Sequence, residues 1–245
     1  TYYARIGASA AGPFTSLGST RTLFTAPSDC AVTRLVRQAG GTDCASIGAC
    51  LAMIPSTPLT GDFCIAVLDS AVYSEQVTII NKDPNGFRIR LWGAAGARPT
   101  VNPPAGSSAG FRIANASVSV ADINVVTTNT VTYGVLVSSA YAALSSMTVD
   151  SGGKIGGAGI FLSSRAVLSY SSVTVQNADG VKITGSSNAI LFSSASAASF
   201  SRGAFYFVGG ASNTLSDSYG FGNPGYGAFL YHSAGNVLAR VRLRN

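Results

Sequence analysis

The hydrophobic residues of this chain recur with a period of about 24 residues. Once per period a glycine precedes a short apolar segment, at intervals of 24, 24, 25, 21, 23 and 24 residues. These glycines are Gly86, Gly110, Gly134, Gly159, Gly180, Gly203 and Gly227. A second apolar signature follows most of them by about ten residues, as in Val120-x-x-Ile123-x-Val125, Leu144-x-x-Met147-x-Val149, Tyr170-x-x-Val173-x-Val175 and Leu238-x-x-Val241-x-Leu243. The repeat predicts stacked units, because one unit cannot bury its apolar face alone.

The apolar residues inside each unit indicate strands. They alternate with a period of two, as Phe111 with Ile113 and Val135 with Val137 do, which is the pattern of a half-buried strand. Abundant Val, Ser, Thr and Gly disfavour helix. We therefore predict an all-β, single-domain parallel β-helix of about eight coils of 21–25 residues. Each repeat glycine is expected at a corner with φ > 0, and the two-residue gap of the second signature at another corner.

The first part of the chain differs from the repeat. Residues 1–29 are predicted to form an extended N-terminal arm, and residues 30–245 the β-helix domain. Near 44–54 a short helix is expected, with Asp43 as its N-cap, Pro55 beyond its end and an apolar face. That face consists of Ile47, Cys50, Leu51 and Ile54. Such a helix would cap the first coil and cover its exposed core and strand edges.

Composition narrows the class of protein. The 245 residues are 47% hydrophobic, but the apolar runs are far shorter than the ~20 residues that span a bilayer, so no membrane insertion is expected. The net charge is +6 and the basic residues are scattered, which indicates a solvated surface, with an anionic polysaccharide as the alternative partner and no nucleic acid. The chain starts at Thr1 without a signal-peptide core, so we expect a piece of a longer protein.

The four cysteines predict two disulfides in a secreted or extracellular protein. Three pairings are possible, and we favour Cys30 with Cys64, since each begins an apolar strand-like run that stacking would place side by side. Cys44 then pairs with Cys50. No Cys-x-x-Cys is present and the single histidine is distant in sequence, so no metal site and no cofactor are expected.

Three stretches near the start carry a family resemblance. "ASIGACLAMIP", "FCIAVLDSAVYSEQVTI" and "GFRIRLWG" resemble the opening of pectin-lyase-like right-handed β-helices, and of pectin methylesterases in particular. The run from Val72 to Ile79 is similar to their Y-x-E-x-V-x-I stretch. The resemblance covers about Cys30 to Val101 and implies a right-handed coil, as does the rule for parallel crossovers.

The catalytic motifs of that superfamily are absent. No Gln-Asp-Thr-Leu or Asp-Phe-Ile-Phe-Gly string occurs. Asn177-Ala178-Asp179-Gly180 resembles the Asn-Thr-Asp-Gly of polygalacturonases, but no second carboxyl follows one coil later, and inverting hydrolysis needs two carboxyls. The tetrapeptide is interpreted as a turn at a coil corner. The chain is therefore predicted not to be an enzyme; a rival site would use Asp150, Asp179 and Lys182.

Aromatic residues crowd between Phe200 and Tyr231. Alternation predicts interior stacks of Phe205 with Phe207 and of Phe229 with Tyr231, and an exposed platform for sugar rings or a partner protein from the complementary residues. Our ligand-binding candidates are Tyr206, Tyr219, Tyr226, Tyr231 and His232.

The last unit, "GAFLYHSAGNVLARVRLRN", alternates like a strand with nothing after it to cover the coil. An uncovered end invites strand addition. We therefore predict a non-catalytic secreted or cell-surface module with a structural, assembly role, as a filament subunit or as a repeat domain of a larger surface protein. Its partners would be itself, stacked head to tail, or adjoining domains. The alternative is a polysaccharide-binding module or an enzyme acting on uronate-type glycans.

Overall fold

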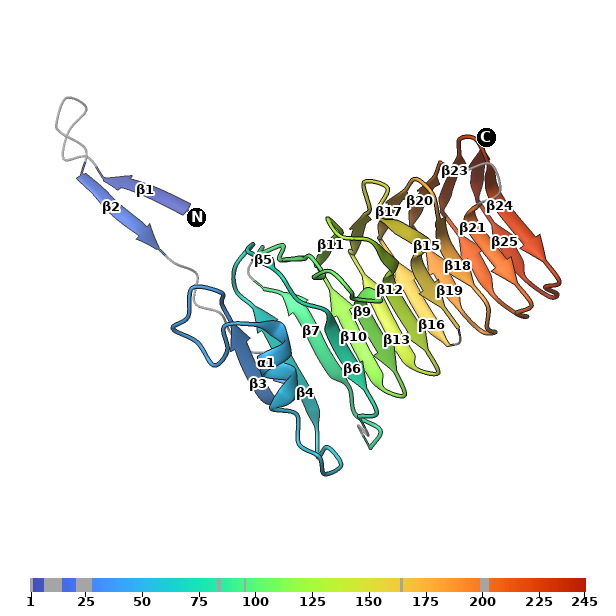
Figure 1. Ribbon diagram of the computed structural model, residues 1–245. Helices are drawn as coiled ribbons and strands as arrows, with labels where there is room; N and C mark the ends of the chain where they lie inside the picture. The colour runs from blue at the N-terminus through green and yellow to red at the C-terminus, as the bar shows by residue number, and fades with distance from the viewer. Residues whose placement is uncertain are drawn as a thin grey trace.

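The structure is a computed structural model that describes residues 2–6, 15–20, 28–82, 85–94, 96–163, 165–198 and 203–245. It confirms an all-β parallel β-solenoid, drawn out along one axis (Figure 1). Three parallel sheets run the length of the solenoid, and the chain visits them in turn.

We name the sheets I, II and III in the order in which the chain enters them. Sheet I contains β3 (Cys30–Val36), β4 (Asp62–Val67), β7 (Ile89–Gly93), β10 (Ser117–Ala121), β13 (Tyr141–Ser145), β16 (Ala166–Ser169), β19 (Ala189–Leu191), β22 (Thr214–Ser216) and β25 (Val237–Ala239). Sheet II contains β5 (Val72–Tyr73), β8 (Thr100–Val101), β11 (Asn124–Val126), β14 (Thr148–Asp150), β17 (Ser172–Val175), β20 (Ser194–Ala197), β23 (Tyr219–Gly222) and β26 (Arg242–Arg244). Sheet III contains β6 (Val77–Ile80), β9 (Ala109–Ala114), β12 (Val131–Ser138), β15 (Ile155–Leu162), β18 (Asp179–Ile183), β21 (Gly203–Val208) and β24 (Tyr226–Tyr231).

The solenoid has about seven turns, rather than the eight coils expected. Sheet III has seven strands among the described residues, sheet II eight and sheet I nine. Strand β3 therefore precedes the first complete turn, and β25 with β26 form an incomplete turn after the last one. The glycine spacing alone could not separate complete turns from partial ones.

The core is built from columns of inward side chains. On sheet I, Leu91, Val120 and Leu144 stand at the same register position in successive strands, and all three are buried. The alternating apolar residues therefore mark the inner face, as predicted. At about 25 cal/mol per Å² of buried apolar surface, such columns dominate the stability of the solenoid.

The two-residue gap of the second signature does mark a corner, between sheets I and II. From β10 onward, one residue at each of these corners adopts a left-handed conformation, with φ between 49° and 56°. These residues are Asp122, Ser146, Tyr170, Phe192, Asp217 and Arg240. The second signature was aligned wrongly where it was taken to begin at Tyr170, because the residue that pairs with Leu144 is Leu168.

The prediction that each repeat glycine has φ > 0 at a corner is wrong for all but the first of them. Most of the others lie inside strands of sheet III, where the backbone approaches the core closely. A Cβ on Gly134 would lie 2.5 Å from Val149 Cγ1 and 2.6 Å from the Gly159 carbonyl oxygen. These glycines are needed because no side chain fits, and not because of a special φ.

Two ladders of buried polar side chains hold successive turns together. Asn188 Nδ2 and its backbone N–H both donate to Asn213 Oδ1 at 2.9 Å, and Asn213 donates in the same way to Asn236. At the corner after sheet I, the backbone N–H of Ser171 donates to Ser193 Oγ, and that of Ser193 to Ser218 Oγ, each at 3.2 Å. Since buried polar groups need partners, these ladders fix the register of the turns.

The only helix among the described residues is α1 (Ile47–Ala52), which is shorter than the range 44–54. Its N-cap is Ser46, whose Oγ accepts from the Ala49 N–H at 3.1 Å. The expectation for Asp43 is wrong, because this carboxylate accepts from the Leu35 N–H instead. The first amides of α1 donate to the two carboxylate oxygens of Glu75, each at 2.8 Å. A negative charge at this position also suits the positive end of the helix dipole.

The apolar face of α1 packs against β3, β4 and β6 at the N-terminal end of the solenoid (Figure 1). Ile47, Cys50 and Leu51 are buried there. Both predicted disulfides form. Cys30 is bonded to Cys64 across the parallel strands β3 and β4, with a Cα–Cα distance of 5.8 Å, and Cys44 to Cys50, at 5.6 Å. Disulfides are typical of an oxidising, extracellular environment.

Within the predicted arm, β1 (Tyr2–Ile6) and β2 (Thr15–Thr20) pair antiparallel in a sheet of their own. Residues 1, 7–14 and 21–27 of the predicted arm lie outside the described residues. The boundary between arm and domain stays a prediction.

Candidate binding surfaces

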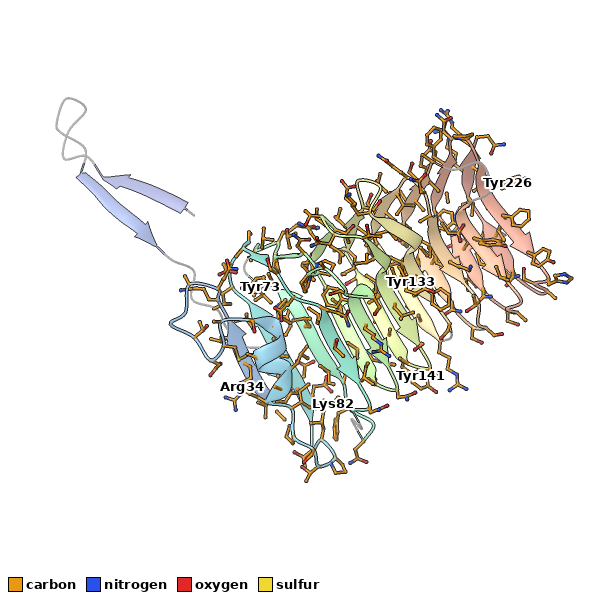
Figure 2. All side chains as sticks on the ribbon, viewed as in Figure 1. Arg34, Tyr73, Lys82, Tyr133, Tyr141 and Tyr226 are labelled. Atoms are coloured by element: carbon orange, nitrogen blue, oxygen red, sulfur yellow. A yellow bond between two sulfur atoms is a disulfide. The ribbon has the colours of Figure 1, made fainter. Side chains whose placement is uncertain are left out.

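Four of the five ligand-binding candidates lie together near the last turns. Tyr206 belongs to β21, while Tyr226, Tyr231 and His232 belong to β24 or follow it directly. With Phe229 they form what we call the aromatic patch, on the outer face of sheet III. Figure 2 shows Tyr226 at this end of the solenoid, with its side chain directed away from the core.

The rings of the aromatic patch contact one another. Phe229 is central, with its ring centroid 4.9 Å from that of Tyr226, 5.3 Å from that of Tyr206 and 6.4 Å from that of Tyr231. His232 meets Tyr231 edge to face at 4.2 Å. Such contacts fix the rings and leave part of their surface to solvent.

The prediction that Phe229 and Tyr231 stack in the interior is wrong. Phe205 and Phe207 are fully buried, and their register partners in β24 are Ala228 and Leu230. Phe229 pairs with the outward-facing Tyr206. The alternation was read in the correct strand but one residue out of phase, which moves every side chain to the other face.

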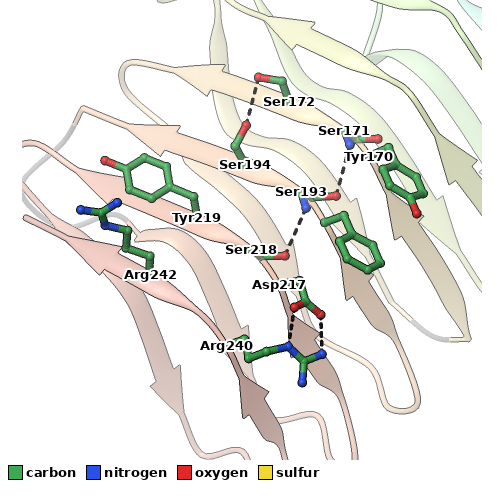
Figure 3. A pocket seen from close by; sticks show the side chains of 11 residues that line it. Tyr170, Ser171, Ser172, Ser193, Ser194, Asp217, Ser218, Tyr219, Arg240 and Arg242 are labelled. Atoms are coloured by element: carbon green, nitrogen blue, oxygen red, sulfur yellow. Dashed lines mark hydrogen bonds and ion pairs between the residues drawn. The ribbon is translucent and has the colours of Figure 1, made fainter.

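The fifth candidate, Tyr219, lies on another surface. It begins β23 of sheet II and lines a groove of about 800 Å³ at the corner where sheet I turns into sheet II (Figure 3). We call it the corner groove. Its lining residues are Tyr170, Ser171, Ser172, Phe192, Ser193, Ser194, Asp217, Ser218, Tyr219, Arg240 and Arg242.

One wall of the corner groove is the row of left-handed corner residues. Tyr170 and Phe192, from successive turns, stack with centroids 5.1 Å apart and ring planes 5° apart. The next two positions hold an ion pair in which Arg240 Nε and Nη2 donate to the two oxygens of Asp217 at 2.5 and 2.7 Å (Figure 3). The hydrogen bonds from Arg240 hold the pKa of Asp217 below its ordinary value, so the carboxylate stays ionised.

Of the three rival catalytic residues, Asp179 and Lys182 lie together, whereas Asp150 lies on another sheet. Asp150 ends β14 on sheet II, whereas Asp179 begins β18 on sheet III. Asp179 is fully buried, and its carboxylate accepts from the Gly203 N–H at 3.3 Å and lies 3.9 Å from Lys182 Nζ. The Asn-Ala-Asp-Gly stretch, interpreted as a turn, is one only in its first half: Asn177 and Ala178 bend the chain after β17, whereas Asp179 and Gly180 already belong to β18.

Two further features concern cofactors and membranes. In the described part of the chain, no group of three or more His, Cys, Asp or Glu side chains gathers where a metal ion would bind. Within the same ranges, no helix has the length and hydropathy needed to cross a bilayer.

The stacked pair of Tyr170 with Phe192 and the polar ladders were not predicted from the sequence. The signal for the asparagine ladder was present, since Asn188, Asn213 and Asn236 each stand two residues before an inward-facing Ile or Leu, at the spacing of the turns. Comparison with models of known protein families and with curated protein sequences finds no match for this chain.

Proposed function

We propose that this chain is a non-catalytic module of a secreted or cell-surface protein, with a structural role in assembly. The observation that supports this proposal is that the acidic side chains form hydrogen bonds and ion pairs within the protein itself. Nine of the ten acidic residues lie in the described ranges, and each contacts a partner inside the protein.

These partners are structural ones. Asp62 forms an ion pair with Arg90 at 2.6 Å, and Asp69 accepts from the Tyr73 hydroxyl at 2.6 Å. Burial and the neighbouring Asp69 raise the pKa of Tyr73, so the phenol keeps its proton. Carboxyls that hydrolyse glycans instead stand in pairs at the substrate.

Incubation with pectin, polygalacturonate and alginate tests this proposal. We expect no release of reducing ends and no unsaturated product, because each acidic side chain in the described ranges is already engaged with a partner inside the protein, including Asp29 and Asp62, which share Arg90. Turnover that Asp179→Asn abolishes, while the control Asp122→Asn retains it, would mean that the chain is an enzyme. Asp122 is a suitable control because it is partly exposed and pairs with Arg98 on the surface.

The proposed assembly uses the last turn. Leu238 and Leu243 continue inner positions of sheets I and II, yet 40% and 42% of their surfaces are exposed. Asn236 Nδ2, which would extend the asparagine ladder, is buried and has no hydrogen-bond partner among the described residues. We propose that this face stacks on a second copy of the chain. Sheet I favours such a head-to-tail contact, since its two edge strands, β3 and β25, run parallel.

We further propose that the coil is right-handed, as in the pectin-lyase-like superfamily that the stretch from about Cys30 to Val101 resembles, and that α1 caps the N-terminal turn. The handedness follows the preference of parallel crossovers.

A second candidate function is polysaccharide binding without turnover, and the aromatic patch favours it. Exposed aromatic rings offer apolar faces to the C–H groups of sugars, and Lys182 Nζ lies 5.3 Å from the centroid of the Tyr206 ring at the edge of the patch. Retention of the chain on a polysaccharide in the incubations above, with no product released, would support this function.

A further inference from the structure

The corner groove has aromatic side chains on both walls. Tyr170 is 65% exposed and Phe192 51% exposed on one wall, and Tyr219 is partly exposed on the other. Tyr170 follows β16 and Tyr219 begins β23, so they lie two solenoid turns apart. The groove therefore presents rings along the solenoid axis, with about 4.8 Å between successive turns.

The groove is rich in hydrogen-bond donors. Ser194 Oγ donates to Ser172 Oγ at 3.3 Å (Figure 3), which leaves the proton of the Ser172 hydroxyl to donate, and Arg242 adds a guanidinium, which donates only. In the described residues Arg242 forms no ion pair.

Strong acceptors in the groove are already occupied. Both oxygens of Asp217 are bound by Arg240, and one of them also accepts from Ser216 Oγ at 3.1 Å. The hydroxyls of Ser193 and Ser218 donate to backbone carbonyls at 2.8 and 2.6 Å. This floor is rigid, because each serine belongs to the ladder between turns. A ligand that only accepts hydrogen bonds suits such a groove best.

A proline-rich segment in the polyproline II conformation has this chemistry. Proline has no N–H to donate, and polyproline II leaves every carbonyl free to accept. Its rings pack on aromatic side chains, as in other aromatic-lined grooves that bind such segments. One turn of this helix advances about 9.3 Å, close to the roughly 9.6 Å of two solenoid turns, which is the interval between Tyr170 and Tyr219.

We propose that the corner groove binds a proline-rich peptide segment in the polyproline II conformation, with an acidic residue of that segment on Arg242. A glycan fits less well, because sugar hydroxyls are bound best by carboxylates, and both carboxylate oxygens in the groove, those of Asp217, are already bound by Arg240. A polynucleotide fits less well too, because it needs several cations, and one of the two arginines here is paired with Asp217.

The test is titration of the full chain with a fluorescent proline decamer, monitored by anisotropy. A glycine-serine decamer of equal length is the control peptide, because it lacks both the rings and the preformed conformation. We expect the proline decamer to bind and the control to bind at least about ten-fold more weakly, since a preformed ligand loses less entropy.

Two sets of variants locate the binding. Tyr170→Ala combined with Phe192→Ala should weaken binding of the proline decamer about ten-fold, while Tyr206→Ala in the aromatic patch leaves it unchanged. A proline decamer that ends in Asp should bind more tightly than one that ends in Asn, because Asp would pair with Arg242. Arg242→Gln, an exposed change, should abolish this difference in affinity. Circular dichroism of each variant checks that the solenoid is intact.

Three results would overturn the proposal. The first is equal affinity for the two decamers, or no binding of either. The second is binding of the proline decamer that neither groove variant weakens. The third is displacement of the decamer from the groove by polygalacturonate or by a single-stranded oligonucleotide at lower concentration, which would assign the groove to that other ligand.

Discussion

Replacing Gly159 with alanine is expected to lower the free energy of unfolding by about 3 kcal/mol, near the upper end of the range for overpacking a core. Gly159 lies in β15, where a Cβ would stand 2.8 Å from the Gly180 carbonyl oxygen and closer still to Val173 Cγ1. The oxygen belongs to the backbone of the next turn, so it cannot move without disturbing the ladder of sheet III. Urea unfolding followed by circular dichroism measures the change.

The control variant is Gly156→Ala in the same strand. A Cβ on Gly156 would meet nothing within 4 Å, and its φ is not in the left-handed region. We expect unchanged stability or a gain of up to about 1 kcal/mol, because alanine has less conformational freedom in the unfolded chain. Equal losses for Gly156→Ala and Gly159→Ala would contradict the close approach of neighbouring turns on sheet III.

Replacing Asn213 with alanine is expected to lower the free energy of unfolding by about 3 kcal/mol. Asn213 is fully buried and accepts two hydrogen bonds from Asn188, one from its backbone and one from its side chain. The substitution leaves the backbone N–H of Asn188 buried without an acceptor and its Nδ2 with only the Ser186 carbonyl, at 3.5 Å. The same urea titration measures the loss.

A matched control exists on the surface. Asn115 Nδ2 donates to Asn81 Oδ1 at 2.9 Å, the same distance as in the buried ladder, but both residues are exposed. Asn81 has a φ of 52°, so glycine is the replacement that removes its side chain without backbone strain. Water replaces the lost partner there, so Asn81→Gly should cost less than about 0.5 kcal/mol. If Asn213→Ala were as mild as Asn81→Gly, the asparagine ladder would not stabilise the stacking of the turns.

The sequence was sufficient for the main features of the fold. Side chains such as Leu91, Val120 and Leu144 repeat at the turn spacing and alternate along each strand, because one inner face must be apolar in every turn. The prediction of stacked strands also placed Cys30 beside Cys64, because each begins an apolar strand-like run, and the two cysteines do occupy neighbouring strands of sheet I.

The reason for the repeat glycines could not be read from the sequence. A glycine is compatible with a positive φ and with a close approach of two backbones, and the sequence alone does not distinguish the two. Here non-glycine residues such as Ser146, Tyr170 and Phe192 adopt the left-handed backbone conformation at the corners. Glycines such as Gly134 instead occupy positions where a neighbouring turn leaves no room for a side chain.

The candidate surfaces were predicted in part. Clustering in sequence indicated the aromatic patch, because Tyr226, Tyr231 and His232 belong to one strand and its end. The stacking of Tyr170 on Phe192 was not predicted, because it depends on which residues lie side by side in successive turns. The sequence repeat had been aligned at Tyr170, whereas the equivalent residue is Leu168, two positions earlier. A shift of two residues leaves the alternation intact but moves a corner residue into the core.

The measurement that tests the proposed assembly role most directly is sedimentation of the chain over a wide range of concentrations. If the last turn stacks on a second copy, the apparent mass rises above the 24.9 kDa of one chain as concentration increases. Leu243→Asp should then remain at the mass of one chain, whereas Val167→Asp, an equally exposed position in the middle of sheet I, should associate like the unmodified chain. A mass of 24.9 kDa for the unmodified chain at every concentration would contradict the proposal.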